Sequence, residues 1–295
     1  MASKILLLGK NGQVGWELTR ALAPLGKLLA LDRQDQGGDI TDFKSLRKII
    51  GDYKPHIIVN AAAYTAVDKA EEEIEQALLI NGEAVGFLAE QAKLYNSWLI
   101  HYSTDYVFDG SGNTPWQETA QTGPLNSYGQ TKLAGEEAIR AVADHYLILR
   151  TSWVYCAYGH NFIKTILRLA KEQQTLNIIA DQIGAPTGAE LIADVTAHCI
   201  NKLTPNLTGV YHLVASGETS WYEFANHIVK QAKNFINEVL VVKEIKPITT
   251  DAYPTAAKRP HNSRLDTEKL TTAFDLYLPA WQLGVNRVIT ELLRK

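Results

Sequence analysis

Short apolar runs alternate with stretches of helical periodicity over the first 150 residues. The runs lie at residues 5–8, 27–31, 57–60, 98–102 and 146–149. Strands that are buried on both faces of a parallel sheet read as continuous apolar runs. A helix after each strand is typical of a doubly wound sheet. We therefore predict an α/β fold with a Rossmann-like, doubly wound parallel sheet.

The turn after the first run is rich in glycine. Gly9, Gly12 and Gly15 follow residues 5–8, and apolar residues at helical spacing come directly after them. Glycines at a strand-to-helix turn let the backbone approach a pyrophosphate, which binds at the helix N-terminus. The spacing differs from the commoner G-x-G-x-x-G. Its place between a strand and a helix nevertheless predicts a dinucleotide site.

The second run leads into Asp32, which Arg33 follows. An acidic residue about twenty positions after the glycines commonly binds the adenosine ribose, whereas an arginine can bind a 2′-phosphate. A turn or cap residue is the alternative interpretation of Asp32. The pair leaves NADH and NADPH both open.

A tyrosine and a lysine are placed for proton transfer. If residues from 127 onward form a helix, Tyr128 and Lys132 are four apart and share one face. A neighbouring ammonium favours the phenolate, so we predict that the pKa of Tyr128 falls below its usual value of about 10. Thr104 follows the run at residues 98–102, and its hydroxyl could hold the oxygen that receives the proton. Tyr-x-x-x-Lys alone is more often a pair on a helix surface, so the interpretation depends on this context.

The alternation becomes less regular after about residue 150. We predict a dinucleotide-binding domain at residues 1–150 and a smaller α/β domain, mainly for substrate, at residues 151–295. Residues 176–214 are expected to pack back on the sheet, and residues 239–245 to form a strand.

Composition narrows the class of protein. The chain of 295 residues has a net charge of −3, and 46% of its residues are hydrophobic, which is ordinary for a globular protein. It shows no basic footprint for nucleic acid or for a membrane surface. Its apolar runs are too short to span a bilayer, and it lacks a signal-peptide pattern. Cys156 and Cys199 are expected to be free thiols, so we predict a cytoplasmic protein.

Taken together, the motifs resemble the extended short-chain dehydrogenase/reductase family. The family pattern of a glycine turn, a threonine after the fourth strand and Tyr-x-x-x-Lys is present in order. The supporting segments are Gly9-Lys-Asn-Gly-Gln-Val-Gly-Trp-Glu17, Asn60-Ala-Ala-Ala-Tyr-Thr-Ala-Val-Asp68, Ser103-Thr-Asp-Tyr-Val-Phe-Asp-Gly110, Tyr128-Gly-Gln-Thr-Lys132, Arg150-Thr-Ser-Trp-Val-Tyr155, Gly184-Ala-Pro-Thr187 and Lys258-Arg-Pro-His-Asn-Ser263. They extend over nearly the whole chain, which makes the resemblance specific.

The resemblance implies an NADPH- or NADH-dependent oxidoreductase of nucleotide-sugar metabolism. Its substrate would be a dTDP-linked keto sugar destined for polysaccharide biosynthesis. The implied catalytic residues are Thr104, Tyr128 and Lys132. The residues expected at the cofactor are Gly9, Asn11, Gly12, Gln13, Val14, Asp32, Arg33, Asp39, Ile40, Ala62, Ala63, Thr65, Tyr128 and Lys132. Those expected at the substrate are Thr104, Asp105, Trp153 and Arg259.

Some relatives are described as dimers bridged by Mg²⁺ through acidic side chains near Glu17 and Glu190. Here Leu191 follows Glu190, where a second carboxylate would be expected. We therefore predict no metal site, with Mg²⁺ left as a less favoured alternative. A monomer and a homodimer are equally allowed.

Two other functions remain open. A nucleotide-sugar epimerase or dehydratase of the same family would keep the tyrosine and the lysine. A dehydratase would usually carry Asp-Glu after the threonine, but Asp105-Tyr106 follows Thr104. A non-catalytic dinucleotide-binding regulatory subunit would share the fold and the glycine turn. Such a subunit would not need the three catalytic side chains.

Overall fold

A parallel sheet forms the centre of the molecule. The computed structural model describes residues 3–235 and 240–294. Within these ranges the main sheet has six strands in the order β10-β5-β4-β3-β1-β2, and every neighbouring pair is parallel. The strands are β1 (Ser3–Leu8), β2 (Gly26–Leu31), β3 (Ile57–Asn60), β4 (Trp98–Thr104), β5 (Tyr146–Thr151) and β10 (Gly209–His212). The predicted doubly wound fold is thus confirmed.

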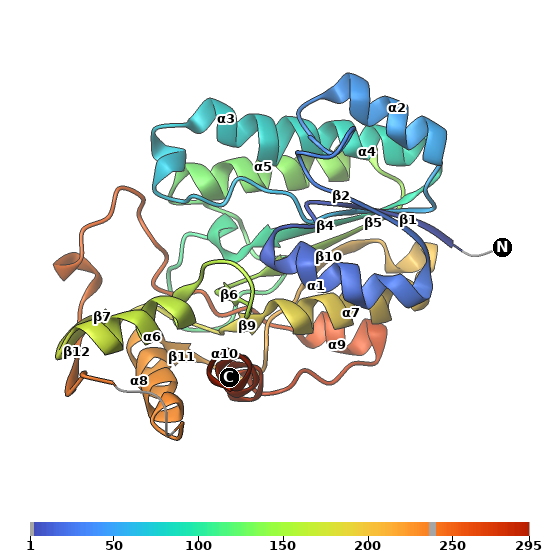
Figure 1. Cartoon of the computed structure of the whole chain (residues 1–295). Helices are drawn as coiled ribbons and strands as arrows, with labels where there is room; N and C mark the ends of the chain where they lie inside the picture. Colours follow the sequence, from blue (N-terminus) through green and yellow to red (C-terminus); the bar gives the residue numbers. More distant parts are fainter. Residues whose placement is uncertain (1–2, 236–239, 295) are drawn as a thin grey trace.

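Helices cover both faces of this sheet (Figure 1). On one face lie α1 (Gln13–Leu22), α7 (Ala189–Asn201) and α9 (Glu268–Phe274), which share an apolar core with the strands. On the other face lie α2 (Phe43–Tyr53), α4 (Ala84–Leu94) and α5 (Ser127–Val142). The strands contribute alternate side chains to the two cores, which explains their continuous apolar sequences.

The helical stretch before β4 is less regular than its sequence predicts. The acidic run at residues 71–73 in the sequence predicts the first turn of one long helix that continues to about Leu94. Instead, the 3₁₀ turn η2 (Lys69–Glu71) precedes α3 (Ile74–Leu78), and the π-helical turn η3 (Leu79–Glu83) separates α3 from α4. Within η3, the Asn81 side chain accepts a hydrogen bond from Tyr64 N at 2.9 Å and donates one to Thr131 Oγ1 at 3.2 Å. The π turn therefore places a buried amide against α5.

The second part of the chain builds its own core from α6 (Phe162–Glu172), α8 (Trp221–Ala232) and α10 (Trp281–Leu293). Its short ladders are β6 (Val154–Tyr155) with β9 (Thr187–Gly188), β8 (Ile183–Gly184) with β11 (Thr219–Ser220), and β7 (Thr175–Ile179) with β12 (Glu244–Ile248). The strand expected at 239–245 is mostly wrong: residue 239 lies outside the described residues, residues 240–243 are not in a strand, and the strand begins at Glu244. Four further 3₁₀ turns connect elements in the described ranges: η1 (Ala23–Leu25), η4 (Asp105–Val107), η5 (Pro205–Leu207) and η6 (Thr250–Ala252).

The stretch from residue 176 to 214 is divided between the two parts. Strand β7 pairs with β12, away from the main sheet, whereas α7 packs on α1 and β10 pairs with β5 at the sheet edge. Among the residues that the structure describes, none of the helices combines the length and apolar character needed to cross a membrane.

Candidate active site

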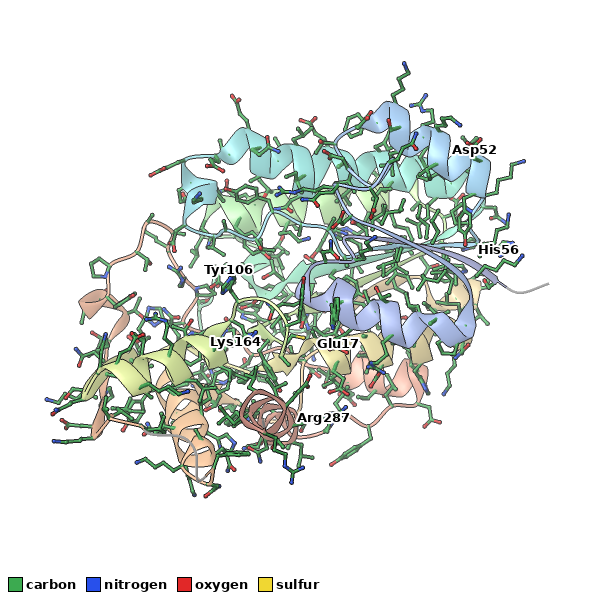
Figure 2. The ribbon with its side chains drawn as sticks, in the orientation of Figure 1. Glu17, Asp52, His56, Tyr106, Lys164 and Arg287 are labelled. Atoms are coloured by element: carbon green, nitrogen blue, oxygen red, sulfur yellow. The ribbon has the colours of Figure 1, made fainter. Side chains whose placement is uncertain are left out.

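The proposed catalytic side chains meet beyond the carboxyl end of β4. Thr104 is the last residue of β4, and Asp105 begins η4. Tyr128 lies in the first turn of α5, where Asn126 caps the helix by accepting a hydrogen bond from Gly129 N at 2.8 Å. The Thr104 hydroxyl hydrogen-bonds to Tyr128 and donates to Asp105 Oδ1 at 3.0 Å. In Figure 2, the adjacent Tyr106 is seen between the α3–α5 layer and α6.

Lys132 lies one helical turn after Tyr128 and is almost fully buried. Its Nζ donates to the carbonyl oxygen of Tyr102 at 2.6 Å and lies 3.1 Å from Nε2 of His101. The amino group is therefore held by the backbone and a side chain of β4. Burial lowers the pKa of Lys132 to about 8, although the Glu136 carboxylate acts in the opposite direction.

The predicted pKa shift of Tyr128 is wrong for the protein without cofactor. Burial raises the pKa of Tyr128, and the negative charge of Asp105 raises it further, whereas the neighbouring Thr104 hydroxyl acts in the opposite direction. The helical spacing correctly places Lys132 one turn after Tyr128 on α5. Its Nζ, however, bonds to Tyr102 and His101 and not to Tyr128. Tyr128 consequently keeps its proton at neutral pH.

Asp105 is buried beside this tyrosine. Removal of its carboxyl group from water raises the pKa of Asp105 to about 6, against the hydrogen bond from Thr104 that favours the charged form. The ring of Tyr106 packs edge-on against Tyr128, with centroids 5.8 Å apart. Asp105 and the Tyr106 ring thus both border Tyr128.

The glycine turn is shaped for close approach of a ligand. Gly9 has a φ of +84°, and a Cβ there would lie 2.6 Å from Ala62 N. At Gly12 an added Cβ would meet only Gly9 O, at 3.4 Å, so this side of the turn is open. No side chain caps the N-terminus of α1, which begins at Gln13. Free N–H groups at an open helix start fit a pyrophosphate.

Acidic residues follow β2 as the sequence predicts. The Asp32 carboxylate accepts hydrogen bonds from the Asn11 side chain and, at 2.9 Å, from Gln34 N. Arg33 is exposed. Asp39 accepts two hydrogen bonds from Thr41, and Ile40 next to it is buried. These residues line the edge where an adenosine ribose would lie if the pyrophosphate bound at Gly12.

The segment after β3 lies next to the glycine turn. Ala62 N donates to Asn60 Oδ1 at 3.1 Å, and Ala62 and Ala63 are partly exposed. Thr65 is exposed. The small side chains leave the backbone accessible next to Gly9.

Trp153 and Arg259 lie on the side of the second part of the chain. Trp153 has a left-handed backbone (φ +48°), and its ring stacks on Trp221 with centroids 3.7 Å apart. Arg259 makes a two-point ion pair with Asp68, with Nη2 2.7 Å from Oδ2. Positive φ at a bulky residue is strained and persists only where surrounding structure enforces it.

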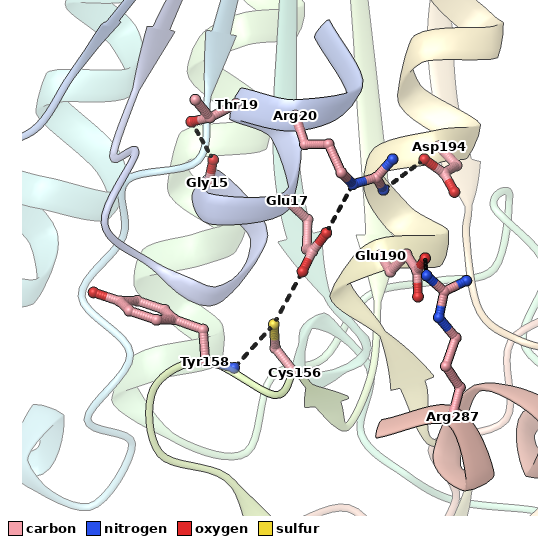
Figure 3. A network of polar contacts seen from close by, with 9 residues as sticks. All are labelled: Gly15, Glu17, Thr19, Arg20, Cys156, Tyr158, Glu190, Asp194 and Arg287. Atoms are coloured by element: carbon pink, nitrogen blue, oxygen red, sulfur yellow. Dashed lines mark hydrogen bonds and ion pairs between the residues drawn. The ribbon is translucent and has the colours of Figure 1, made fainter. Parts of the chain in front are cut away.

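The acidic side chains considered for a metal lie elsewhere, between α1, α7 and α10 (Figure 3). Glu190 forms an ion pair with Arg287 at 2.7 Å. Glu17 accepts hydrogen bonds from Arg20 and from the Cys156 thiol. Both carboxylates are thus engaged by side chains of this chain.

Several residues at the site were not identified from the sequence. They are Asn60 and His101, which form a buried chain with Lys132; Glu136 and Arg150, which pair beneath α5; and Trp221, which stacks on Trp153. A histidine inside an otherwise apolar strand was a signal for His101. Trp221 follows Ser220, which caps α8 by accepting a hydrogen bond from Glu223 N at 3.0 Å.

The chain was compared with known proteins. The family model described as "RmlD substrate binding domain" matches residues 3–294. The dTDP-4-dehydrorhamnose reductases of Escherichia coli K12 and Salmonella typhimurium are 54% and 53% identical to it over 294 residues, covering 98% of this chain and 97% of each relative.

Solved structures agree with this assignment. A crystal structure of dTDP-4-dehydrorhamnose reductase from Bacillus anthracis in complex with NADP has a TM-score of 0.89 and 35% identity, and covers 99% of this chain and 100% of that one. The Clostridium acetobutylicum reductase has a TM-score of 0.90 and 36% identity, with the same coverage. The resemblance stated from the motifs is confirmed, and the chain belongs to the RmlD substrate binding domain family.

Proposed function

We propose that this protein reduces the C4 keto group of dTDP-4-dehydro-L-rhamnose (dTDP-4-dehydro-6-deoxy-L-mannose) with NADPH or NADH. The product is dTDP-L-rhamnose, and the reaction is the last step of dTDP-rhamnose biosynthesis. The observation that carries the proposal is the contact of the Thr104 and Tyr128 hydroxyls in a chain more than half identical to reductases named for this reaction.

Tyr128 is the proton donor in this proposal. Its raised pKa keeps the phenol protonated until an alkoxide forms next to it. Thr104 hydrogen-bonds the keto oxygen and thereby holds it at the phenol. Proton transfer by a positioned acid contributes factors of about 10²–10⁴ to a rate. When bound, the reduced nicotinamide supplies the hydride.

Lys132 holds the nicotinamide ribose, and the glycine turn holds the pyrophosphate. The open side of Gly12 and the uncapped start of α1 support this placement. Asn11, Gln13 and Val14 border the same turn. The adenosine ribose contacts Asp32 or Asp39, with Arg33 available for a 2′-phosphate. Ile40, Ala62, Ala63 and Thr65 complete the cofactor site.

Asp105 and Trp153 contact the sugar, and Arg259 contacts the nucleotide phosphates. The support for Arg259 is its position: it pairs with Asp68, at the end of the segment after β3, and it hydrogen-bonds to Tyr106 next to the catalytic pair. We keep residues 1–150 as the dinucleotide-binding domain and residues 151–295 mainly as the substrate domain. A cytoplasmic location and a monomeric or homodimeric state stay predictions.

Direct assay tests the function. Purified protein is mixed with NADPH and enzymatically made dTDP-4-dehydro-L-rhamnose. Loss of reduced-nicotinamide absorbance together with formation of dTDP-L-rhamnose is the expected result. Interconversion of sugars without net consumption of NADPH would instead indicate an epimerase. Dinucleotide binding with no turnover of this substrate would favour a non-catalytic subunit.

A further inference from the structure

A buried chain of hydrogen bonds leads from the cofactor side of β3 to Lys132. Ala62 N donates to Asn60 Oδ1 at 3.1 Å, and Asn60 Nδ2 lies 3.2 Å from His101 Nδ1. His101 Nε2 lies 3.1 Å from Lys132 Nζ, and this Nζ also donates to Tyr102 O. The side chains of Asn60, His101 and Lys132 are at most 2% exposed, so water does not compete for these contacts.

The direction of each hydrogen bond follows from one fixed donor. The backbone N–H of Ala62 can only donate, so the Asn60 atom that faces it is the carbonyl oxygen. The Asn60 amino group therefore points at His101 Nδ1 and donates to it. Burial lowers the pKa of His101 well below 6.5, so the ring is neutral. A neutral ring that accepts at Nδ1 carries its proton on Nε2.

This tautomer determines which protonation state of Lys132 is favoured. The Nε2–H bond points at Lys132 Nζ, and an ammonium has no lone pair with which to accept it. A neutral amine accepts the proton of Nε2 and still donates to Tyr102 O. An ammonium would leave two donors facing each other in a buried place, which is unfavourable. Every group in the chain is satisfied only when Lys132 is uncharged.

We propose that His101 is a positioning residue whose Asn60-fixed ring donates from Nε2 to the Lys132 amine and thereby favours the neutral form of Lys132 over the ammonium. The inference rests on the proposed function for its meaning in catalysis. A lysine that takes up a proton here breaks one hydrogen bond of the chain. It therefore holds that proton weakly and passes it on readily, as a group of the proton-transfer site should.

The charged groups around Lys132 do not by themselves favour the neutral amine. Glu136 lies one turn further along α5 and favours the ammonium, but it is paired with Arg150 of β5. The remaining groups near this part of α5 are His101 of β4, Asp105 and Tyr106 of η4, Tyr128 of α5 itself, Glu71 of η2, which binds Ser127 N, and the uncharged Asn81 of η3.

The tautomer of His101 is the first test. Full-length cofactor-free protein labelled with ¹⁵N-histidine is measured by two-bond ¹H–¹⁵N NMR, and His101 is identified by its absence from a His101→Gln spectrum. Well above pH 8, where the Lys132 amine is neutral, we expect a neutral ring protonated at Nε2. A ring protonated at Nδ1 would overturn the proposal. The measurement needs no substrate, so it is independent of whether the protein reduces dTDP-4-dehydro-L-rhamnose.

Asn60→Asp should reverse the direction of the hydrogen bonds along the chain, and it does so with almost no change in side-chain shape. The carboxylate still accepts from Ala62 N, but it accepts from His101 as well, so the ring proton should move to Nδ1. Nε2 then accepts from a Lys132 ammonium. We expect the pKa of Lys132, measured with ¹³Cε-lysine and assigned with Lys132→Met, to rise by at least about one pH unit. An unchanged tautomer in the folded variant would contradict the proposal.

The charge that Asn60→Asp introduces needs a matched control. In a His101→Leu background, the same substitution brings the same charge without the imidazole. The rise in the pKa of Lys132 should then be clearly smaller than in the wild-type background. Equal rises in the two backgrounds would show that charge alone acts and that His101 does not transmit the change. If the variant does not fold, the tautomer of the wild-type protein decides.

Discussion

Arg150 and Glu136 form a two-point ion pair between β5 and α5. The Arg150 Nε atom lies 2.9 Å from Glu136 Oε1, and Nη2 lies 2.6 Å from Oε2. Their side chains are 2% and 0% exposed. Because α5 carries Tyr128 and Lys132, this pair fixes the catalytic helix to the sheet.

Removal of one partner should be costly because the other charge stays buried. We expect Glu136→Ala to lower the free energy of unfolding by about 3–5 kcal/mol, measured by urea denaturation. Glu137→Ala is the matched control, because its side chain is exposed and the loss should stay within about 0.5 kcal/mol. The double variant Glu136→Leu/Arg150→Met should recover much of the loss. Equal stability of the two alanine variants would contradict the structural role of the pair.

Tyr128→Phe removes the proposed proton donor and little else. We expect turnover to fall by about 10²–10⁴-fold, with dinucleotide affinity nearly unchanged. Steady-state kinetics and a dinucleotide titration separate the two effects. Tyr277→Phe is the control, since that side chain is 89% exposed on the surface. Near-normal turnover of Tyr128→Phe would show that another group donates the proton.

The buried carboxyl group of Asp105 should make stability depend on pH. Its pKa is about 6 in the folded protein and about 3.9 when unfolded, so the folded state binds more protons between these values. Its contribution to stability is fully present below about pH 4 and is lost as the pH rises through about 6. The amide of Asp105→Asn does not titrate, so this variant does not lose stability in this way as the pH rises. Relative to wild type, its free energy of unfolding should therefore rise by up to about 3 kcal/mol from pH 4 to 7. A difference that does not vary with pH would refute the raised pKa.

Arg33 should contribute mainly to the binding of NADPH, and Asp32 mainly to the binding of NADH. The exposed Arg33 guanidinium can bind a 2′-phosphate, and charge-assisted hydrogen bonds are worth about 1.5–3 kcal/mol. We expect Arg33→Ala to raise the KM for NADPH by about 10–100-fold and to leave the KM for NADH almost unchanged. Asp32→Ala should affect NADH more strongly. Equal effects of Arg33→Ala on the two cofactors would remove Arg33 from the 2′-phosphate site.

Local sequence patterns were sufficient for most of the sheet. Residues 5–8, 57–59 and 146–149 are continuous apolar runs because both faces of their strands are buried, and each lies within a strand of the main sheet. The π turn at η3 had no such signal. It depends on the contact of Asn81 with Tyr64 and with α5, which the spacing of apolar residues does not encode.

The candidate site shows the same division between local and long-range information. The spacing of Tyr128 and Lys132 correctly placed them one turn apart on α5. It could not show that the Lys132 amino group bonds to Tyr102 and His101, which lie about thirty residues earlier. The direction of the Tyr128 pKa was predicted wrongly because the spacing shows neither the burial of the phenol nor the Asp105 carboxylate beside it, and both raise the pKa. Pairs such as Arg150 with Glu136 likewise depend on which strand packs beneath which helix.

A substitution at Gly15 tests the glycine turn, because an added side chain would clash with the backbone of that turn. Its φ is not left-handed, but a Cβ there would clash with Gly9 O and would lie 2.7 Å from Gly9 C and 2.9 Å from Lys10 Cα. Gly15→Ala should displace this turn and weaken dinucleotide binding by at least about 10-fold, or about 1.4 kcal/mol.

Gly112→Ala is the complementary control, because its φ is +71° and an added Cβ would meet no atom within 4 Å. It should cost about 1–2 kcal/mol of stability through backbone strain and leave dinucleotide affinity unchanged. Calorimetric titration with NADPH, combined with thermal unfolding, measures both quantities. If Gly15→Ala bound NADPH as tightly as wild type, the pyrophosphate could not depend on the backbone of this turn, and the cofactor site would have to be placed elsewhere.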